Sequence, residues 1–117
     1  MTLEEISRVL DARPVGRARS AGKNIRMACG CDLMSDVLAF IKADALLLTG
    51  LTNLQVVRTA EIADVAAICF VRGKEPAAET IELADAKGIP LLVTELPLYE
   101  SCGRLYREGL PGCHERA

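Results

Sequence analysis

The stretch ALLLTGLTNLQVVRTAEIADVAAICFV, residues 45–71, contains two short apolar runs separated by a helical pattern. The runs ALLLT (45–49) and AICFV (67–71) are apolar throughout, which is typical of strands that are buried on both faces of a sheet. Between them, apolar residues recur at helical spacing: Val56, Val57, Ala60 and Ala63. A strand, a helix and a second strand in this order predict two parallel strands joined by a right-handed crossover.

The same unit repeats on both sides of this stretch. Upstream, the strand candidate IRMAC (25–29) precedes an apolar helix face made of Met34, Val37, Leu38 and Ile41. Downstream, a helix face with Ala77, Ile81, Ala84 and Gly88 leads into the strand candidate IPLLVT (89–94). A last helix, lined by Leu98, Cys102 and Leu105, is expected to end at Gly109.

The N-terminal part begins with a helix that Thr2 and Glu5 start as a capping box and that ends near Asp11. Residues 13–24 mix Pro, Gly and Arg without periodicity, which indicates a loop or at best a short irregular strand. The chain is therefore predicted to be a small three-layer α/β sandwich, with a mostly parallel sheet of four or five strands flanked by helices. We expect one domain over residues 1–110, whose first 24 residues are the helix and a basic loop, and a flexible tail over 111–117.

Composition narrows the classes of function. The 117 residues are 50% hydrophobic and 26% charged, without a run of eighteen apolar residues, which excludes disorder and a membrane span. A formal net charge of −2 and an aromatic content of 3% argue against nucleic-acid binding. The acidic, helical start lacks the pattern of a secretory signal, so a cytoplasmic location is expected.

One local cluster of positive charge stands out. Between residues 13 and 26 there are five basic residues and no acidic residue: Arg13, Arg17, Arg19, Lys23 and Arg26. Such a cluster is either a small patch that attracts anions or a solvated basic loop.

Ligands of open parallel sheets bind outside the carboxyl ends of the strands, which directs attention to the loops there. Free backbone N–H groups at the helix starts, together with two loop cations, are suited to a phosphate. The candidate ligand-binding residues are Gly30, Asp32, Ser35, Thr49, Gly50, Thr52, Asn53, Arg72 and Lys74. Each also has a structural interpretation, since Asp32 and either Thr52 or Asn53 are good N-caps and the glycines permit tight turns.

Five cysteines are an odd number for a disulfide framework, and reduced thiols are expected in a cytoplasmic chain. Cys69 and Cys102 occupy apolar positions and are expected to be buried. Cys29 and Cys31 are two apart on a strand and point to one face, which makes them weak candidates for metal or redox chemistry.

Catalytic patterns are few. The nearest approach to a phosphate-binding loop, GRARSAGKN (16–24), has one residue too many between its glycines and Asn24 in place of Ser or Thr. The single histidine, His114, lies in the expected tail. A small phosphoryl-transfer or hydrolytic enzyme is therefore the weakest hypothesis, and no cofactor is predicted.

Four pieces of the sequence together resemble the DRTGG-domain family over roughly residues 25–110. They are DLMSDV (32–37), the V-x-G-x-x-P-x-x-x-T-I pattern (71–81), GIPLL (88–92) and GRLY (103–106). The family's namesake pentapeptide is absent, and TGLTN (49–53) stands at about its place.

The resemblance implies a regulatory function. DRTGG domains are similar to the N-terminal domain of HPr kinase/phosphorylase and occur in some phosphate acetyltransferases and regulated pyrophosphatases. Stand-alone versions resemble small proteins encoded beside iron-only hydrogenase or NADH-dehydrogenase-like subunits. We therefore expect a non-enzymatic regulatory module that homodimerises, binds a small anionic ligand or nucleotide, and associates with a redox-enzyme or kinase-type partner. The alternative is a redox or metal-binding accessory protein that uses Cys29 and Cys31.

Overall fold

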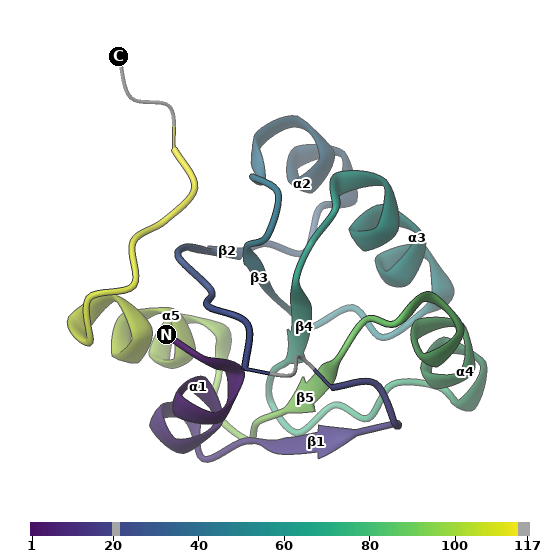
Figure 1. Cartoon of the computed structure of the whole chain (residues 1–117), viewed down its shortest axis with the longest axis horizontal. Coiled ribbons are helices and arrows are strands. Elements are labelled where there is room, and N and C mark those ends of the chain that lie inside the picture. The colour runs from purple at the N-terminus through teal and green to yellow at the C-terminus, as the bar shows by residue number, and fades with distance from the viewer. Residues whose placement is uncertain (20–21, 115–117) are drawn as a thin grey trace.

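The computed structural model describes residues 1–19 and 22–114, and these form five helices and five strands. The sheet order is β1-β5-β4-β3-β2, with four parallel strands and β1 antiparallel at one edge. The strands are β1 (Arg13–Val15), β2 (Ala28–Gly30), β3 (Leu46–Thr49), β4 (Ala67–Phe70) and β5 (Leu91–Val93). The helices are α1 (Leu3–Leu10), α2 (Met34–Phe40), α3 (Leu54–Ala63), α4 (Ala78–Lys87) and α5 (Leu98–Arg107). Figure 1 shows the arrangement.

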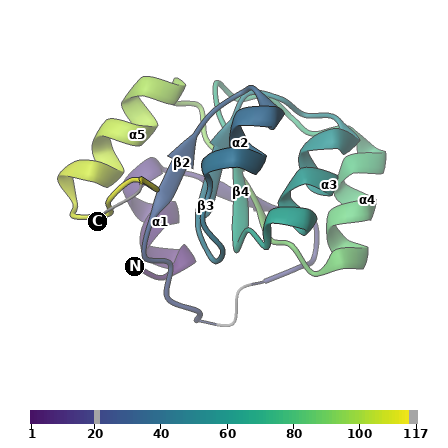
Figure 2. The same ribbon diagram turned by 90° about the horizontal axis from the view of Figure 1, so that it is seen from above.

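The helices cover the sheet in two layers, with α2, α3 and α4 on one face and α1 and α5 on the other (Figure 2). Successive residues of one strand alternate between the two layers. Leu47 packs toward α2, α3 and α4, whereas Leu46 and Leu48 pack toward α1 and α5. All three are fully buried, which explains why the strand reads as apolar at every position. The predicted three-layer α/β fold with a mostly parallel sheet is confirmed.

Local signals placed several helix ends correctly. The Thr2 hydroxyl accepts from the Glu5 N–H at 3.2 Å, and the Glu5 carboxylate accepts from the Thr2 N–H at 2.8 Å, which is the expected capping box. Asn53, not Thr52, caps α3, since its side-chain oxygen accepts from the Gln55 N–H at 3.1 Å. Gly88 ends α4 in the left-handed conformation, with φ of +71°.

The strand expected over residues 25–29 is wrong in its bounds, because β2 begins at Ala28. Ile25 is fully buried, but it belongs to the layer of α1 and α5, and its N–H donates to the carbonyl of Met1 at 2.7 Å. Pairing with the N-terminal segment thus replaces pairing with β3 at this position. The irregular strand allowed for within residues 13–24 exists as β1, which pairs antiparallel with β5.

The apolar face expected for α2 is incomplete. Val37 is fully buried, but Leu38 is 47% exposed and Phe40 is 63% exposed. The helix has only seven residues and covers the end of the sheet next to β2, so one side of it remains in solvent.

The segment after α5 does not simply leave the domain. The Ala28 N–H donates to the Pro111 carbonyl at 2.9 Å, and Gly112 forms a parallel bridge with Ala28. The last three residues of the tail expected over 111–117 lie outside the described residues. Among the described helices, none has both the length and the apolar character needed to cross a membrane.

Candidate functional site

The four parallel strands end at one edge of the sheet, which we call the carboxyl edge. The loops that leave it are residues 31–33, 50–53, 71–77 and 94–97. Each loop leads into a helix, so backbone N–H groups at four helix starts lie around this edge. Most of the candidate residues lie in these loops: Asp32, Gly50, Thr52, Asn53, Arg72 and Lys74.

Asp32 joins two of these loops. Its Oδ1 atom accepts from the hydroxyl of Thr49 at 2.9 Å and from the N–H of Gly50 at 2.7 Å. The interpretation of Asp32 as an N-cap is wrong: Leu33 occupies the N-cap position of α2, and within the described part of the chain no side chain caps this helix. The reason is that Thr49 is fully buried at the end of β3 and its hydroxyl needs an acceptor, which Asp32 provides.

Lys74 approaches the same point from the next loop. A Cβ atom placed on Gly50 would lie 3.6 Å from the Lys74 Nζ atom and 3.6 Å from each carboxylate oxygen of Asp32. The carboxylate and the ammonium group therefore both lie close to Gly50. The structure thus brings together Asp32, Thr49, Gly50 and Lys74.

The loop after β4 is held in an unusual backbone conformation. Arg72 has φ of +58° and Gly73 has φ of +65°, both in the left-handed region. The Arg72 N–H donates to the Leu96 carbonyl at 2.9 Å, and the Gly73 N–H donates to the Thr94 carbonyl at 2.8 Å. These bonds tie the loop to the one after β5, while the Arg72 side chain is exposed. A non-glycine residue in this conformation is strained, and strain of this kind often accompanies a functional role.

Replacement of Arg72 by glycine is therefore expected to raise the free energy of unfolding, by up to about 1 kcal/mol, because glycine adopts positive φ without steric cost. Urea denaturation of the wild type and the variant measures this difference. Arg72→Ala is the matched control, since it removes the same side chain but keeps the strained backbone. A glycine variant no more stable than the alanine variant would show that the backbone at Arg72 is not strained.

The other candidate residues have structural contacts of their own. The Thr52 carbonyl accepts from the Ala77 N–H at 3.4 Å and from the Thr80 hydroxyl at 2.9 Å, so its loop is fixed to the start of α4. Gly30 faces α5, and a Cβ there would lie 2.5 Å from the Sγ atom of Cys102. Ser35 is exposed in the first turn of α2. Gly30 thus permits close packing of α5 on the sheet.

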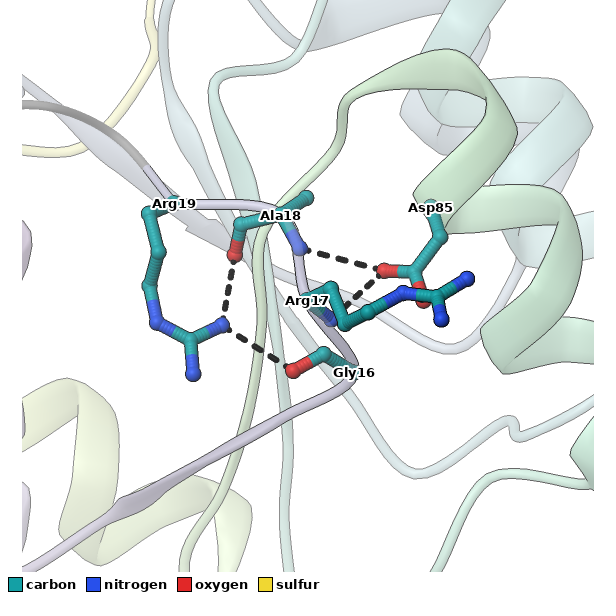
Figure 3. Close-up of polar contacts among 5 residues, drawn as sticks. All are labelled: Gly16, Arg17, Ala18, Arg19 and Asp85. Carbon is teal, nitrogen blue, oxygen red and sulfur yellow. Dashed lines mark hydrogen bonds and ion pairs between the residues drawn. The ribbon is translucent and has the colours of Figure 1, made fainter.

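The basic segment between residues 13 and 26 is largely anchored by acids from other elements. Asp85 of α4 accepts at Oδ1 from the N–H groups of Arg17, at 2.8 Å, and Ala18, at 3.1 Å (Figure 3). The Arg19 guanidinium folds back and donates to the carbonyls of Gly16 and Ala18. Further ion pairs join Arg13 to Glu75 and Lys23 to Asp44. Because acids already compensate much of its charge, this pairing favours the interpretation of the segment as a basic loop over its interpretation as an anion-attracting patch.

The contacts of Asp85 make the basic loop sensitive to acid. The Arg17 N–H, and secondarily the Ala18 N–H and the charge of Arg17, hold the pKa of Asp85 below its usual range. A depressed carboxyl pKa contributes stability that is present above the unfolded pKa and lost as the pH falls through the folded pKa. We therefore expect Asp85→Asn to show a weaker loss of stability than the wild type below about pH 4. Urea midpoints measured from pH 7 to pH 3 test this, and parallel curves for the two proteins would contradict it.

The cysteines differ in their surroundings. Burial raises the pKa of Cys69 to about 12, and this thiol is fully enclosed in β4, as the sequence predicted. Cys102 is only half-buried, against the layer of α1 and α5. Cys29 and Cys31 are half-buried on the opposite face of the sheet, and Cys113 packs beside them, a neighbour that the sequence pattern did not reveal. Within residues 1–19 and 22–114, no three His, Cys, Asp or Glu side chains are grouped in a way that suits a metal ion.

The chain was compared with protein families, curated proteins and solved structures. No family model and no curated protein matches the chain. A solved structure does match: the CBS and DRTGG domains of the regulatory region of Clostridium perfringens pyrophosphatase, complexed with the activator diadenosine tetraphosphate. The similarity covers 89% of this chain with a TM-score of 0.74, at 16% sequence identity. The fold is DRTGG-like.

The DRTGG-like fold agrees with the resemblance seen in residues 25–110. The chain spans 45% of the length of the pyrophosphatase regulatory region that it matches, and at 16% identity the likeness establishes the fold alone. Two kinds of sequence signal predicted this fold. They are the apolar runs of the buried strands and the glycine and proline residues near the ends of α3, α4 and α5. The contact between Asp32 and Thr49, by contrast, has no local signal, since 17 residues separate the two.

Proposed function

We propose that this chain is a non-enzymatic regulatory module that binds a small anionic ligand of the nucleotide type at the carboxyl edge. The observation on which the proposal rests is the approach of Lys74 to Gly50, which places a positively charged group beside the backbone at the end of β3. The exposed, strained Arg72 adds a second cation to the same loop. Phosphate groups are recognised in this way, by cations together with backbone N–H groups at helix starts.

Asp32 has a positioning role in this proposal. Its carboxylate accepts from the Gly50 N–H and the Thr49 hydroxyl, which fixes the start of the loop after β3. Its carboxylate and the Lys74 amine both lie near Gly50, and their opposite charges attract each other. An arriving phosphate would then compete with Asp32 for Lys74, which favours a ligand that carries more than one negative charge.

The structural neighbour supports the same class of ligand. It is a regulatory region, not a catalytic one, and it was solved with a nucleotide activator that carries four phosphates. Because the likeness is one of fold, the nucleotide is carried over to this chain as a proposal and is tested on its own residues.

A ligand-dependent shift in thermal unfolding tests the proposal. We expect diadenosine tetraphosphate or ATP to raise the melting temperature, since a ligand at a hundredfold excess over its Kd adds about 2.7 kcal/mol of stability. Adenosine is the matched control, because it has the base and sugar without the phosphates. Equal melting temperatures with every phosphate compound tested, up to millimolar concentration, would contradict an anion site.

We further propose that the module works as a cytoplasmic homodimer that modulates a redox-enzyme or kinase-type partner, with iron-only hydrogenase systems as the first candidates. Leu33, Leu38 and Phe40 are large apolar residues exposed on and beside α2, and such patches favour association. Native mass spectrometry of protein purified without oxygen reports the number of subunits. A dimer is the expected result, and a monomer at micromolar concentration would contradict it.

A further inference from the structure

The C-terminal segment runs along the free side of β2. This strand is at one end of the sheet, opposite β1, so no other strand of the described residues pairs with its outer side. There, the Ala28 N–H donates to the Pro111 carbonyl at 2.9 Å, and Gly112 bridges to Ala28 in the parallel direction. Figures 1 and 2 show the segment after α5 lying beside β2. Residues 111–112 thus cover part of the sheet edge with one short contact.

The bridge places two thiols next to each other. Cys29 follows Ala28, and Cys113 follows Gly112, so the cysteines are neighbours across two parallel segments. Both are half-buried and pack against the same core layer, which means that their side chains point to the same face. Neighbouring strands are about 4.8 Å apart. This spacing is within the range of Cα separations, roughly 4.4–6.8 Å, that a disulfide spans.

The other cysteines are less well placed for Cys29. Cys31 lies on the same face but two residues farther along, and its thiol donates to the Leu33 carbonyl at 3.5 Å, within its own loop. Cys102 packs on the opposite face of the sheet, and Cys69 is fully buried. Two residues on one strand cannot approach as closely as two neighbours on adjacent strands, since their Cα atoms are about 6.6 Å apart.

We propose that Cys29 and Cys113 are a redox-sensitive pair whose disulfide fastens the C-terminal segment to the edge of β2. This inference is independent of the anion site, because it rests on residues at the other side of β2. The disulfide would add a covalent link to the bridge at Ala28 and to the packing of Cys113, and would keep the edge strand covered.

The reaction that we propose is thiol–disulfide exchange with a small disulfide such as oxidised glutathione. The Cys113 thiolate attacks one sulfur of the small disulfide, forms a mixed disulfide and releases one small thiolate. The Cys29 thiolate then attacks the Cys113 sulfur and releases the second small thiolate. Two protein thiols are oxidised, one small disulfide is reduced, and the two protons that leave the protein are taken up by the released thiolates.

The environment of Cys29 limits the rate of the second step, in which this thiol attacks the mixed disulfide. Burial raises the pKa of this thiol to about 11, with the nearby thiols, first of all Cys113, adding to the shift. The thiolate is therefore scarce at neutral pH, and we expect disulfide closure to accelerate about tenfold per pH unit between pH 7 and pH 9.

Peptide mapping by mass spectrometry after oxidation tests the pair. We expect wild-type protein incubated with oxidised glutathione to lose two hydrogens per chain and to yield one cross-linked peptide that contains Cys29 and Cys113. Cys31→Ser and Cys102→Ser are matched controls and should give the same cross-link. The Cys113→Ser variant should instead give only free thiols or mixed disulfides with glutathione, without the cross-linked peptide.

A second readout follows the segment itself. Hydrogen exchange of the Ala28 N–H should slow in the oxidised protein and return to its former rate after reduction. A dominant link between Cys29 and Cys31, a link between two chains, or no protein disulfide at all would each overturn the proposal. An unchanged exchange rate at Ala28 in protein shown to be cross-linked would overturn the fastening of the segment.

Discussion

Replacing Asp32 by alanine is expected to lower the free energy of unfolding by about 2 kcal/mol. The carboxylate accepts two hydrogen bonds, one from the buried Thr49 hydroxyl and one from the Gly50 N–H. Alanine removes the acceptor, so the buried Thr49 hydroxyl loses its hydrogen-bond partner. The loss of stability is therefore larger than for an ordinary surface substitution. Hydrogen bonds to a charged acceptor contribute roughly 1.5–3 kcal/mol to the free energy of unfolding. Because Asp32 itself is exposed, we expect a loss in the lower part of this range. Chemical denaturation at neutral pH measures the change.

Asp32→Asn separates the charge of this residue from its shape. The asparagine carbonyl oxygen can still accept from both Thr49 and Gly50, but without the negative charge that strengthens these bonds, so we expect it to lose only about half as much stability as alanine. Asp36→Ala, in the first turn of α2, is a control for removal of an acidic residue close by. An Asp32→Ala variant as stable as the wild type would show that the two loops do not depend on this carboxylate.

Removal of both cations of the loop after β4, in the variant Arg72→Ala/Lys74→Ala, is expected to weaken nucleotide binding by about thirtyfold to about 140-fold. Each contact between a cation and a phosphate oxygen is assigned about 1–1.5 kcal/mol at an exposed site, and 1.4 kcal/mol corresponds to a factor of ten in Kd. Both side chains are exposed, so the fold should be retained. Isothermal titration calorimetry of the wild type and the double variant measures the ratio.

Salt and a distant cation provide the controls for this result. Binding to the wild type should weaken as ionic strength rises, because exposed charges are screened over about 10 Å at 0.1 M salt. Arg107→Ala, on the exposed part of α5, removes a positive charge from another surface and should leave the Kd unchanged. Equal loss of affinity in this control and in the double variant would mean that overall charge, and not the carboxyl edge, attracts the ligand.

The elements that sequence predicted well are those whose signals are local. The apolar runs at 45–49 and 67–71 became β3 and β4 because a strand that is covered by helices on both faces must be apolar at every position. The start at Thr2 and the end at Gly88 depend on residues within one helical turn. Such features need no knowledge of the rest of the chain.

The elements that sequence could not place depend on distant partners. Asp32 has the composition of an N-cap, but its partners are at positions 49 and 50. Asp85 anchors a loop that lies 67 and 68 residues earlier in the chain. Cys113 meets Cys29 only because the chain returns to β2 after α5. A pattern of hydrophobic residues fixes which face a residue occupies, whereas these contacts also require the order of the strands.

The measurement that tests the central claim most directly is a titration of the wild-type protein with diadenosine tetraphosphate, followed by amide nitrogen–proton correlation spectra. The account predicts that the amide signals that shift most are those of the carboxyl edge, in particular Gly50, Arg72, Gly73 and Lys74. Signals from α5 and from the loop anchored by Asp85 should move little. Unchanged spectra at millimolar ligand, or shifts centred on a different surface, would contradict a nucleotide site at the ends of the parallel strands.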